Sequence, residues 1–119
     1  MRRTEDPAPT VSADAVQRAR RIALVGFDVD GTLTDGSIVI GPQGEAMKRF
    51  DVRDGLGLVL LRRAGLRIAI VTGRRSEIVE RRAEELGFDH VLQAVQDKRA
   101  ALDALCAQQG IGLAQCAFI

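Results

Sequence analysis

A chain of 119 residues fits one compact domain, and a formal net charge of +1, from 17 basic and 16 acidic residues, predicts no basic surface for nucleic acid or anionic lipid. No segment approaches the roughly 20 apolar residues of a membrane span, and the amino terminus lacks the apolar core of a signal peptide. The two cysteines, Cys106 and Cys116, lie in apolar segments, which favours buried reduced thiols over a disulfide or a redox role. We therefore expect a cytoplasmic protein without nucleic-acid or membrane partners.

The expected elements begin after a polar tail. Residues 1–10 carry two of the three prolines and are predicted to be loose. A short helix through Arg20 follows, and the apolar run at 22–27 predicts the first strand. We therefore divide the chain into residues 1–20, a tail with a short helix, and residues 21–119, the folded domain.

The segment SIVIGPQGEAMKRF, residues 37–50, predicts a β-hairpin. Two short extended runs flank Gly41, Pro42 and Gly44, which are typical of a hairpin loop of a few residues. The rest of the predicted domain has no insertion of larger size. We therefore expect no separate cap domain over a functional site.

From Gly55 the chain alternates helix and strand. The pattern predicts helices near 55–64, 76–86 and 97–109, and strands at 67–71, 90–92 and 116–119. Apolar runs such as RIAIV lack alternation, which is typical of parallel strands covered on both faces. Right-handed crossovers then give an open, doubly wound α/β sheet, in which ligands bind beyond the carboxyl ends of the strands.

The segment FDVDGTLTDG, residues 27–36, places two aspartates at that edge. Asp28 closes the first strand, and Asp30 follows it, with Gly31 permitting a sharp turn. Two carboxylates in one pocket suit a hard divalent cation such as Mg²⁺, or a division into an ionised nucleophile and a proton carrier. The backbone N–H groups of Gly31 and Thr32 are candidate donors to a phosphate oxygen.

Other interpretations of this segment are weaker. DVDG resembles the opening of an EF-hand calcium loop, but Leu33 and Val39 stand where that loop requires glycine and glutamate. A polar turn with the aspartates acting only as caps is the structural alternative. A response-regulator receiver also has an aspartate at the end of a parallel strand, but Asp-Gly-Thr is not expected after it.

Two further segments place polar groups at the same edge. The strand at 67–71 runs into Thr72, Gly73 and Arg74, which offer a hydroxyl, a backbone N–H and a guanidinium. Lys98 stands near the start of the helix after the third strand and is one of only two lysines among 17 basic residues. A compact ammonium group there suits the neutralisation of an aspartate and a phosphate together. A helix cap and a solvated side chain are the simpler explanations of either segment alone.

These three segments, in this order, resemble the haloacid dehalogenase superfamily of phosphatases. Its first motif, Asp-x-Asp-Gly-Thr, matches residues 28–32, the second motif matches Thr72, and the third matches Lys98. The continuation through the hairpin to Arg53 and Asp54 is similar to the 3-deoxy-D-manno-octulosonate 8-phosphate phosphatase family. That family serves lipopolysaccharide synthesis in Gram-negative bacteria.

The resemblance implies a role for each matching residue. Asp28 would attack the phosphorus and become an aspartyl phosphate, and Asp30 would protonate the leaving sugar oxygen and then deprotonate a water. The Asp28 carboxylate and the Asp30 backbone carbonyl would hold Mg²⁺. Thr72 and Lys98 would orient and neutralise the phosphoryl group. Further implied contacts to phosphate or substrate are Gly31, Thr32, Arg53, Asp54, Gly73 and Arg74.

The resemblance also implies an assembly and a missing part. Such phosphatases form tetramers in which hairpins of neighbours complete each site, so we expect a homotetramer through residues 37–50. The superfamily's fourth motif, an acidic loop with a further Mg²⁺ ligand, would follow Ile119. We therefore expect an enzyme truncated before that motif, without the C-terminal part of the fold and with impaired turnover. The alternatives are a noncatalytic interaction module, like the phosphatase-like domain of some sialic-acid cytidylyltransferases, and a phosphatase for another small sugar phosphate.

Overall fold

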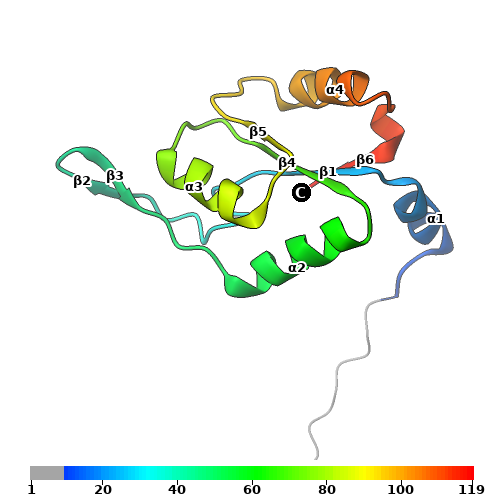
Figure 1. The fold of residues 1–119 in the computed structure, drawn as a ribbon, viewed down its shortest axis with the longest axis horizontal. Helices are drawn as coiled ribbons and strands as arrows, with labels where there is room; N and C mark the ends of the chain where they lie inside the picture. The colour runs from blue at the N-terminus through cyan, green and yellow to red at the C-terminus, as the bar shows by residue number, and fades with distance from the viewer. Residues whose placement is uncertain (1–9) are drawn as a thin grey trace, which may run out of the picture.

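The computed structural model describes residues 10–119, so nearly all of the tail expected at 1–10 lies outside the described part. The helices and strands are, in chain order, α1 (Ala13–Arg21), β1 (Leu24–Phe27), β2 (Val39–Gly41), β3 (Gly44–Met47), α2 (Val52–Arg63), β4 (Arg67–Val71), α3 (Glu77–Leu86), β5 (His90–Leu92), α4 (Lys98–Gln108), the 3-10 helix η1 (Leu113–Gln115) and β6 (Cys116–Phe118). Four parallel strands form one sheet in the order β5-β4-β1-β6, and β2 and β3 form a separate antiparallel hairpin (Figure 1). The predicted α/β architecture is confirmed.

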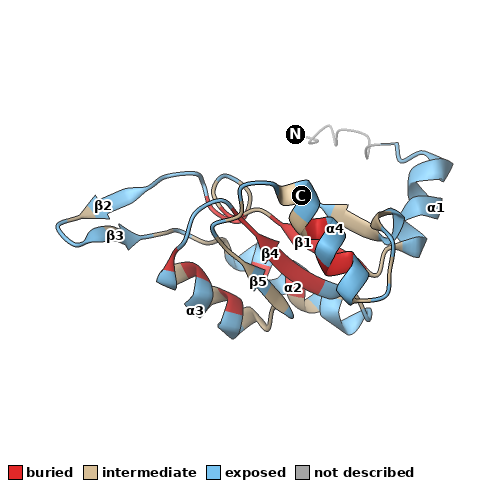
Figure 2. Cartoon of the chain, turned by 90° about the horizontal axis from the view of Figure 1, so that it is seen from above, coloured by how far each residue is buried: buried red, intermediate tan, exposed pale blue. Residues whose placement is uncertain are grey.

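The strands of the main sheet are apolar on both sides because helices cover both faces. Val25 and Phe27 of β1 pack with Leu58 of α2 in one buried cluster. Leu24 of the same strand packs with Leu105 of α4 in another. Figure 2 shows β1 and β4 as the buried centre of the molecule, with exposed elements around them. The runs without alternation therefore belong to a doubly covered parallel sheet, as predicted.

Gly26 brings β1 close to its neighbours. A Cβ at this position would lie 3.0 Å from Cδ2 of Leu102, on α4, and 3.1 Å from Cδ2 of Phe118, on β6. Contacts of this length force a neighbouring side chain to shift. The missing side chain therefore permits the close layer packing beside the strand end that carries Asp28.

The helix expected at 55–64 is α2, and its predicted start was wrong. The helix begins three residues earlier, at Val52, because the carboxylate of Asp51 accepts a hydrogen bond from N of Arg53 at 2.8 Å and caps the helix. Arg53 and Asp54 therefore lie in the first helical turn. The other helices and strands predicted for the main sheet agree with the structure to within two residues at each end.

The hairpin projects from the sheet past α3 (Figure 1). Gly41 faces Gly44 at its turn, as expected from the loop residues, and a bridge between Thr34 and Phe50 closes its base. Figure 2 shows the hairpin exposed along most of its length. Its exposed apolar side chains are Ile38, Val39, Ile40 and Met47. The hairpin is therefore an appendage and not a part of the core.

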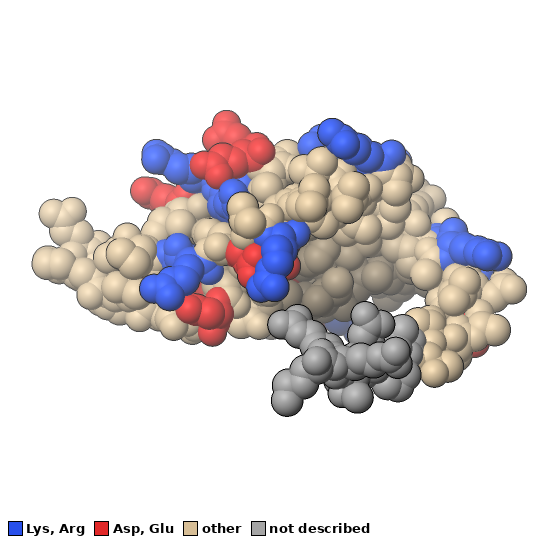
Figure 3. All heavy atoms as spheres, turned by 90° about the horizontal axis from the view of Figure 1, so that it is seen from below, with Lys and Arg blue, Asp and Glu red and all other residues tan. Residues whose placement is uncertain are grey.

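Several properties expected from composition can be compared with the fold. None of the helices in residues 10–119 has the length and apolar character that a membrane crossing requires. Cys106 is buried, Cys116 is partly buried, and both are free thiols packed in the apolar cluster beneath α4, as expected. On the face shown in Figure 3, basic and acidic groups lie next to one another, so neither sign dominates it.

Candidate functional site

Asp28 follows β1 directly, at the edge of the sheet predicted for a ligand. Its Oδ2 lies 3.0 Å from Nζ of Lys98, and its Oδ1 accepts a hydrogen bond from N of Val29 at 2.8 Å. Lys98 is the first residue of α4, so the loop after β5 delivers it to the end of β1. The structure thus brings residues of the first and third motifs into direct contact.

The surroundings of Asp28 favour its ionised form. Burial would raise the pKa of this carboxyl, but the hydrogen bonds from Lys98 and from N of Val29, the positive charge of Lys98 and the Thr72 hydroxyl outweigh burial and lower the pKa. Thr72 itself is buried at the end of β4. Asp28 is therefore a carboxylate near neutral pH, which is the state that a nucleophile requires.

The loop after β4 is fixed by backbone hydrogen bonds. The N–H of Thr72 donates to O of Leu92 at 3.0 Å, and its carbonyl accepts from N of Val95 at 3.0 Å. By contrast, the N–H of Gly73 has no acceptor in the described part of the chain. Gly73 therefore presents a free donor at the strand end.

The tight turn after β1 uses two donors that the sequence analysis left free. The N–H of Gly31 donates to Oγ1 of Thr34 at 3.2 Å, and the N–H of Thr32 donates to O of Val29 at 3.1 Å. The expectation that these two N–H groups are free to bind phosphate is therefore wrong for this structure. The N–H of Asp30, in contrast, has no acceptor within residues 10–119.

Asp30 and Asp28 have different contact partners. Its Oδ1 forms a short ion pair with Nζ of Lys48, and its Oδ2 lies 4.0 Å from Nε of Arg74. Lys48 follows β3 directly, and only 1% of its side chain is exposed. Arg74 was predicted as a site residue and lies beside Asp30, whereas Lys48 was not among the predicted residues.

Glu45 of β3 completes a second cluster around Asp30. Its Oε2 lies 3.0 Å from Nζ of Lys48 and 3.9 Å from Nη2 of Arg74, and its Oε1 accepts a hydrogen bond from the hydroxyl of Ser76. Burial would raise the pKa of Glu45, but Ser76 and Lys48 lower it. Burial would lower the pKa of Lys48, but Asp30 and Glu45 raise it. Both groups are therefore charged near neutral pH.

The rarity of lysine was a usable signal for this second cluster. The chain has only two lysines, and each contacts one aspartate of the first motif: Lys98 contacts Asp28, and Lys48 contacts Asp30. The argument that singled out Lys98 therefore applied equally to Lys48. Glu45 gave no comparable signal, because it is one of 16 acidic residues.

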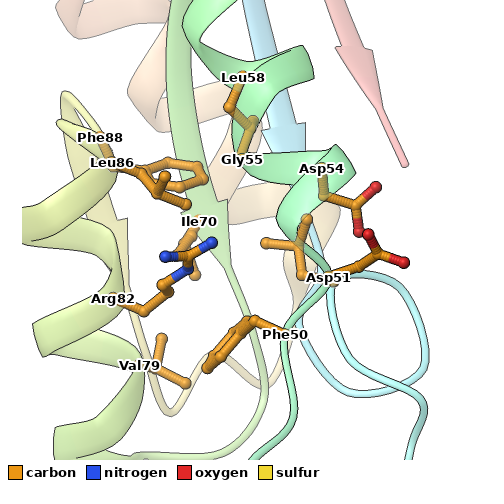
Figure 4. Close-up of a pocket in the computed structure, with 11 residues that line it drawn as sticks. Phe50, Asp51, Asp54, Gly55, Leu58, Ile70, Val79, Arg82, Leu86 and Phe88 are labelled. Atoms are coloured by element: carbon orange, nitrogen blue, oxygen red, sulfur yellow. The ribbon is translucent and has the colours of Figure 1, made fainter.

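Arg53 and Asp54 do not contact Asp28, Asp30 or the charged residues paired with them. The Arg53 side chain is 88% exposed, and its Nη2 lies 2.7 Å from Oδ2 of Asp51. Figure 4 shows the carboxylates of Asp51 and Asp54 together at the start of α2, directed away from the guanidinium of Arg82. Asp54 and Thr32 line an open hollow of about 450 Å³ beside the turn. Within the described chain, no ion pair joins either predicted residue to the aspartates of the first motif.

The strand end offers oxygen donors of the kind that a hard cation prefers. These donors are the Asp28 carboxylate and the backbone carbonyl of Asp30, which accepts no hydrogen bond in the described part. Residues 10–119 contain no group of three or more His, Cys, Asp or Glu side chains that could hold a metal ion. The two donors fit Mg²⁺ as part of its coordination shell, and water or other ligands must supply the rest.

The comparisons with known proteins agree with the motifs. No protein-family model matches the chain. The 3-deoxy-D-manno-octulosonate 8-phosphate phosphatase of Yersinia pestis is 43% identical over 109 residues, which cover 92% of this chain and 58% of that protein. The chain therefore spans somewhat more than half the length of this curated relative.

Solved structures show the same likeness. The 3-deoxy-D-manno-octulosonate 8-phosphate phosphatase of Moraxella catarrhalis, in complex with magnesium, phosphate and KDO, superposes with a TM-score of 0.83 at 47% identity, over 86% of this chain and 59% of that chain. The cobalt-bound phosphatase of Haemophilus influenzae gives 0.82 at 39% identity, over 86% and 60%. The resemblance inferred from three motifs is confirmed: this chain is a homologue of the 3-deoxy-D-manno-octulosonate 8-phosphate phosphatases and has the fold of the haloacid dehalogenase superfamily.

Proposed function

We propose that this chain carries the nucleophile and the proton carrier of a Mg²⁺-dependent phosphatase acting on 3-deoxy-D-manno-octulosonate 8-phosphate, in the synthesis of lipopolysaccharide precursors. The observation that carries the proposal is the contact between Asp28 Oδ2 and Lys98 Nζ, 3.0 Å apart at the carboxyl end of β1. The similar Moraxella catarrhalis enzyme was solved with magnesium, phosphate and KDO together, which supports the same chemistry here.

The first step uses the ionised state of Asp28. One of its carboxylate oxygens attacks the phosphorus, and the bond from phosphorus to the sugar oxygen breaks, leaving an aspartyl phosphate on Asp28. The ammonium group of Lys98, already in contact with Asp28, offsets the negative charge of the phosphoryl oxygens. The N–H of Gly73 would orient one of those oxygens, which is supported by its lack of an acceptor in the described chain.

Asp30 handles the protons in both steps. In its protonated form it protonates the sugar oxygen as that oxygen leaves, and the proton that it then accepts from the attacking water restores this form for the next cycle. Asp30 is tied to Lys48 and not to Lys98, so the two carboxylates have different partners. Different partners permit different tasks for two groups that are two residues apart.

Mg²⁺ would be held by the Asp28 carboxylate and the Asp30 backbone carbonyl. When bound, it supplies positive charge that lets an anionic nucleophile approach an anionic phosphate. These two donors form only part of a coordination shell, and the family resemblance implies a further acidic ligand from a fourth motif. We therefore expect the 119-residue chain by itself to bind Mg²⁺ weakly and to turn over slowly.

We also propose that the chain assembles as a tetramer through the hairpin. Ile40 and Met47 are 66% and 55% exposed there, which supports a role for the hairpin as a contact surface. In such an assembly the hairpin would help to close the site of a neighbour. Sedimentation at working concentrations measures the assembly, and a monomer would contradict it.

Phosphate release from 3-deoxy-D-manno-octulosonate 8-phosphate tests the proposed activity. We expect slow release that requires Mg²⁺, and only background release from Asp28→Asn, because the amide keeps the shape of the nucleophile without its charge. Asp14→Asn, the same change at an exposed position in α1, is the matched control and should keep the wild-type rate. Mg²⁺-dependent release that persists in Asp28→Asn would contradict the proposal.

A further inference from the structure

The root of the hairpin contacts the strand-end site of its own chain. Lys48 and Glu45 come from the hairpin, whereas Asp30, Arg74 and Ser76 come from the ends of the elements around the site. Lys48 binds Asp30 and Glu45 at once, and Glu45 also accepts a hydrogen bond from the hydroxyl of Ser76. These contacts connect an otherwise exposed appendage to the carboxylate proposed as the proton carrier.

We propose that Lys48 is a positioning residue: it anchors the hairpin to Asp30 in the same chain and thereby holds the Asp30 carboxylate in place for proton transfer. The anchoring rests on the contacts described above. The part that concerns proton transfer rests on the proposed function.

Burial makes Lys48 a specific contact and not a solvated charge. Its side chain is 1% exposed, and an ammonium group covered from solvent in this way requires opposite charge and hydrogen-bond acceptors around it. Asp30 and Glu45 provide both, and the ammonium group has enough N–H donors to serve two carboxylates. Removal of the ammonium group would leave two carboxylates close together without the cation between them.

Glu45 connects the same cluster to the start of α3. It accepts a hydrogen bond from the hydroxyl of Ser76, which is the N-cap of α3. Oγ of Ser76 in turn accepts a hydrogen bond from N of Val79 at 3.4 Å. The N–H of Ser76 also donates to Oε1 of Gln93 at 2.7 Å, beyond the end of β5. Lys48 is therefore held between the turn after β1, which carries Asp30, and the start of α3. Contacts on both sides suit a residue that fixes the position of the Asp30 carboxylate.

The two oxygens of Asp30 differ in their contacts. Oδ1 is bound by Lys48, whereas Oδ2 lies 4.0 Å from Nε of Arg74, beyond hydrogen-bond distance. The Arg74 side chain is 50% exposed, so it holds Oδ2 far less firmly than Lys48 holds Oδ1. Lys48 thus fixes one oxygen and leaves the other free to exchange a proton with the leaving group or with water.

Two substrates separate a positioning role from a general loss of activity. The sugar phosphate has a poor leaving group that needs a proton, whereas p-nitrophenyl phosphate has a good leaving group that needs none. With Lys48→Met we expect formation of the aspartyl phosphate, measured in a single turnover, to slow by about tenfold or more with the sugar phosphate and to stay within about threefold with p-nitrophenyl phosphate. The attack of water on the aspartyl phosphate is the same for both substrates and therefore does not distinguish them. Arg63→Met removes an exposed charge from the last turn of α2, outside the hairpin, and should leave both rates unchanged.

Hydrogen exchange measures the anchoring without any activity. Peptides that cover residues 37–50 should exchange about tenfold faster in Lys48→Met and in Glu45→Gln than in the wild type, whereas peptides from β4 should be unaffected. The Glu45→Gln variant keeps the lysine, so it serves if Lys48→Met does not fold.

Each outcome decides one part of the inference. Faster hairpin exchange together with a loss confined to the sugar phosphate supports both parts. Unchanged hairpin exchange in both variants overturns the anchoring. Equal slowing of the first step with both substrates overturns the positioning role, because the loss would then not depend on the proton that the leaving group needs. If the wild type hydrolyses neither substrate, the proposed function and the positioning role fall together, and hydrogen exchange alone decides the anchoring.

Discussion

Asp28 and Asp30 stand two residues apart in the chain, yet different parts of the molecule hold them. Asp28 is held by the sheet and its crossovers, through N of Val29 and the ammonium group of Lys98 at the start of α4. Asp30 is held by the hairpin, through the buried ammonium group of Lys48. The first frame is a buried core, and the second is an exposed appendage secured by charges (Figure 2).

Because different parts of the molecule hold Asp28 and Asp30, we expect that mutations can impair nucleophilic attack and proton transfer separately. Changes to the core should affect the nucleophile together with the stability of the domain, because the same residues do both. Changes to the hairpin should affect the proton carrier while the domain stays folded.

Lys98→Met should lower the rate of phosphate release by about 10²–10³-fold. The variant loses the ammonium group that contacts Asp28 and offsets the negative charge of the phosphoryl oxygens. The first step should slow with both substrates, unlike in Lys48→Met. Arg99→Met, the adjacent exposed cation on α4, is the control and should have no effect. Rates within about twofold of the wild type for Lys98→Met would show that the contact with Asp28 is not used.

The core and the hairpin should differ in how much a buried or exposed isoleucine contributes to the free energy of unfolding. Ile70 in β4 is 2% exposed, and Ile40 in the hairpin is 66% exposed. Ile70→Ala should lower the free energy of unfolding by about 2–5 kcal/mol, because it leaves a cavity in the core. Ile40→Ala should change it by less than about 0.5 kcal/mol in a monomer. Denaturant unfolding followed by circular dichroism measures both, and similar losses would refute the description of the hairpin as an appendage.

Acid should release the hairpin through Glu45. The pKa of Glu45 is lowered below its usual 4.5 by contacts with Ser76 and Lys48, despite burial. The stabilisation is therefore complete above the unfolded-state pKa, and it is lost as the pH falls through the folded-state pKa. Amide chemical shifts of residues 37–50 should show this loss below about pH 4.5, the usual value for this carboxyl. Glu45→Gln should lack the transition, and an identical transition in that variant would assign it to another group.

The reactivity of Cys116, in β6, reports on the main sheet and should not change when the hairpin contacts are altered. Burial and the neighbouring Cys106 raise the pKa of the Cys116 thiol from 9.0 to about 11. At pH 8 we therefore expect alkylation by iodoacetamide about tenfold to a hundredfold slower than in the unfolded chain, because the thiolate is scarcer. The rate should be the same in Lys48→Met. A faster rate in that variant would mean that the hairpin also supports the sheet.

The sequence was sufficient where the interactions are local or follow from the order of the motifs. The apolar runs gave the strands of the main sheet, because burial on both faces removes alternation. Thr72 and Lys98 were found because parallel strands end at one edge, so polar groups after β4 and β5 meet the end of β1.

The sequence was insufficient where one side chain competes with another. Asp51 and Asp54 are both good helix caps, and only the structure shows that Asp51 takes that role and extends α2. The hydroxyl of Thr34 takes the N–H of Gly31, which looked free in the motif alone. The Lys48 contact joins residues 18 apart across a hairpin, and no local pattern sets that distance.

The central claim is that Asp28 forms the covalent bond to phosphorus, and chemical trapping tests it most directly. The chain is incubated with Mg²⁺ and 3-deoxy-D-manno-octulosonate 8-phosphate, quenched in acid and reduced with borohydride, which converts an aspartyl phosphate to homoserine. Peptide mass spectrometry should then find homoserine at position 28 in the wild type and in Lys48→Met, and none in Asp28→Asn. Phosphate release without any homoserine at position 28, or with homoserine at another aspartate, would contradict the account.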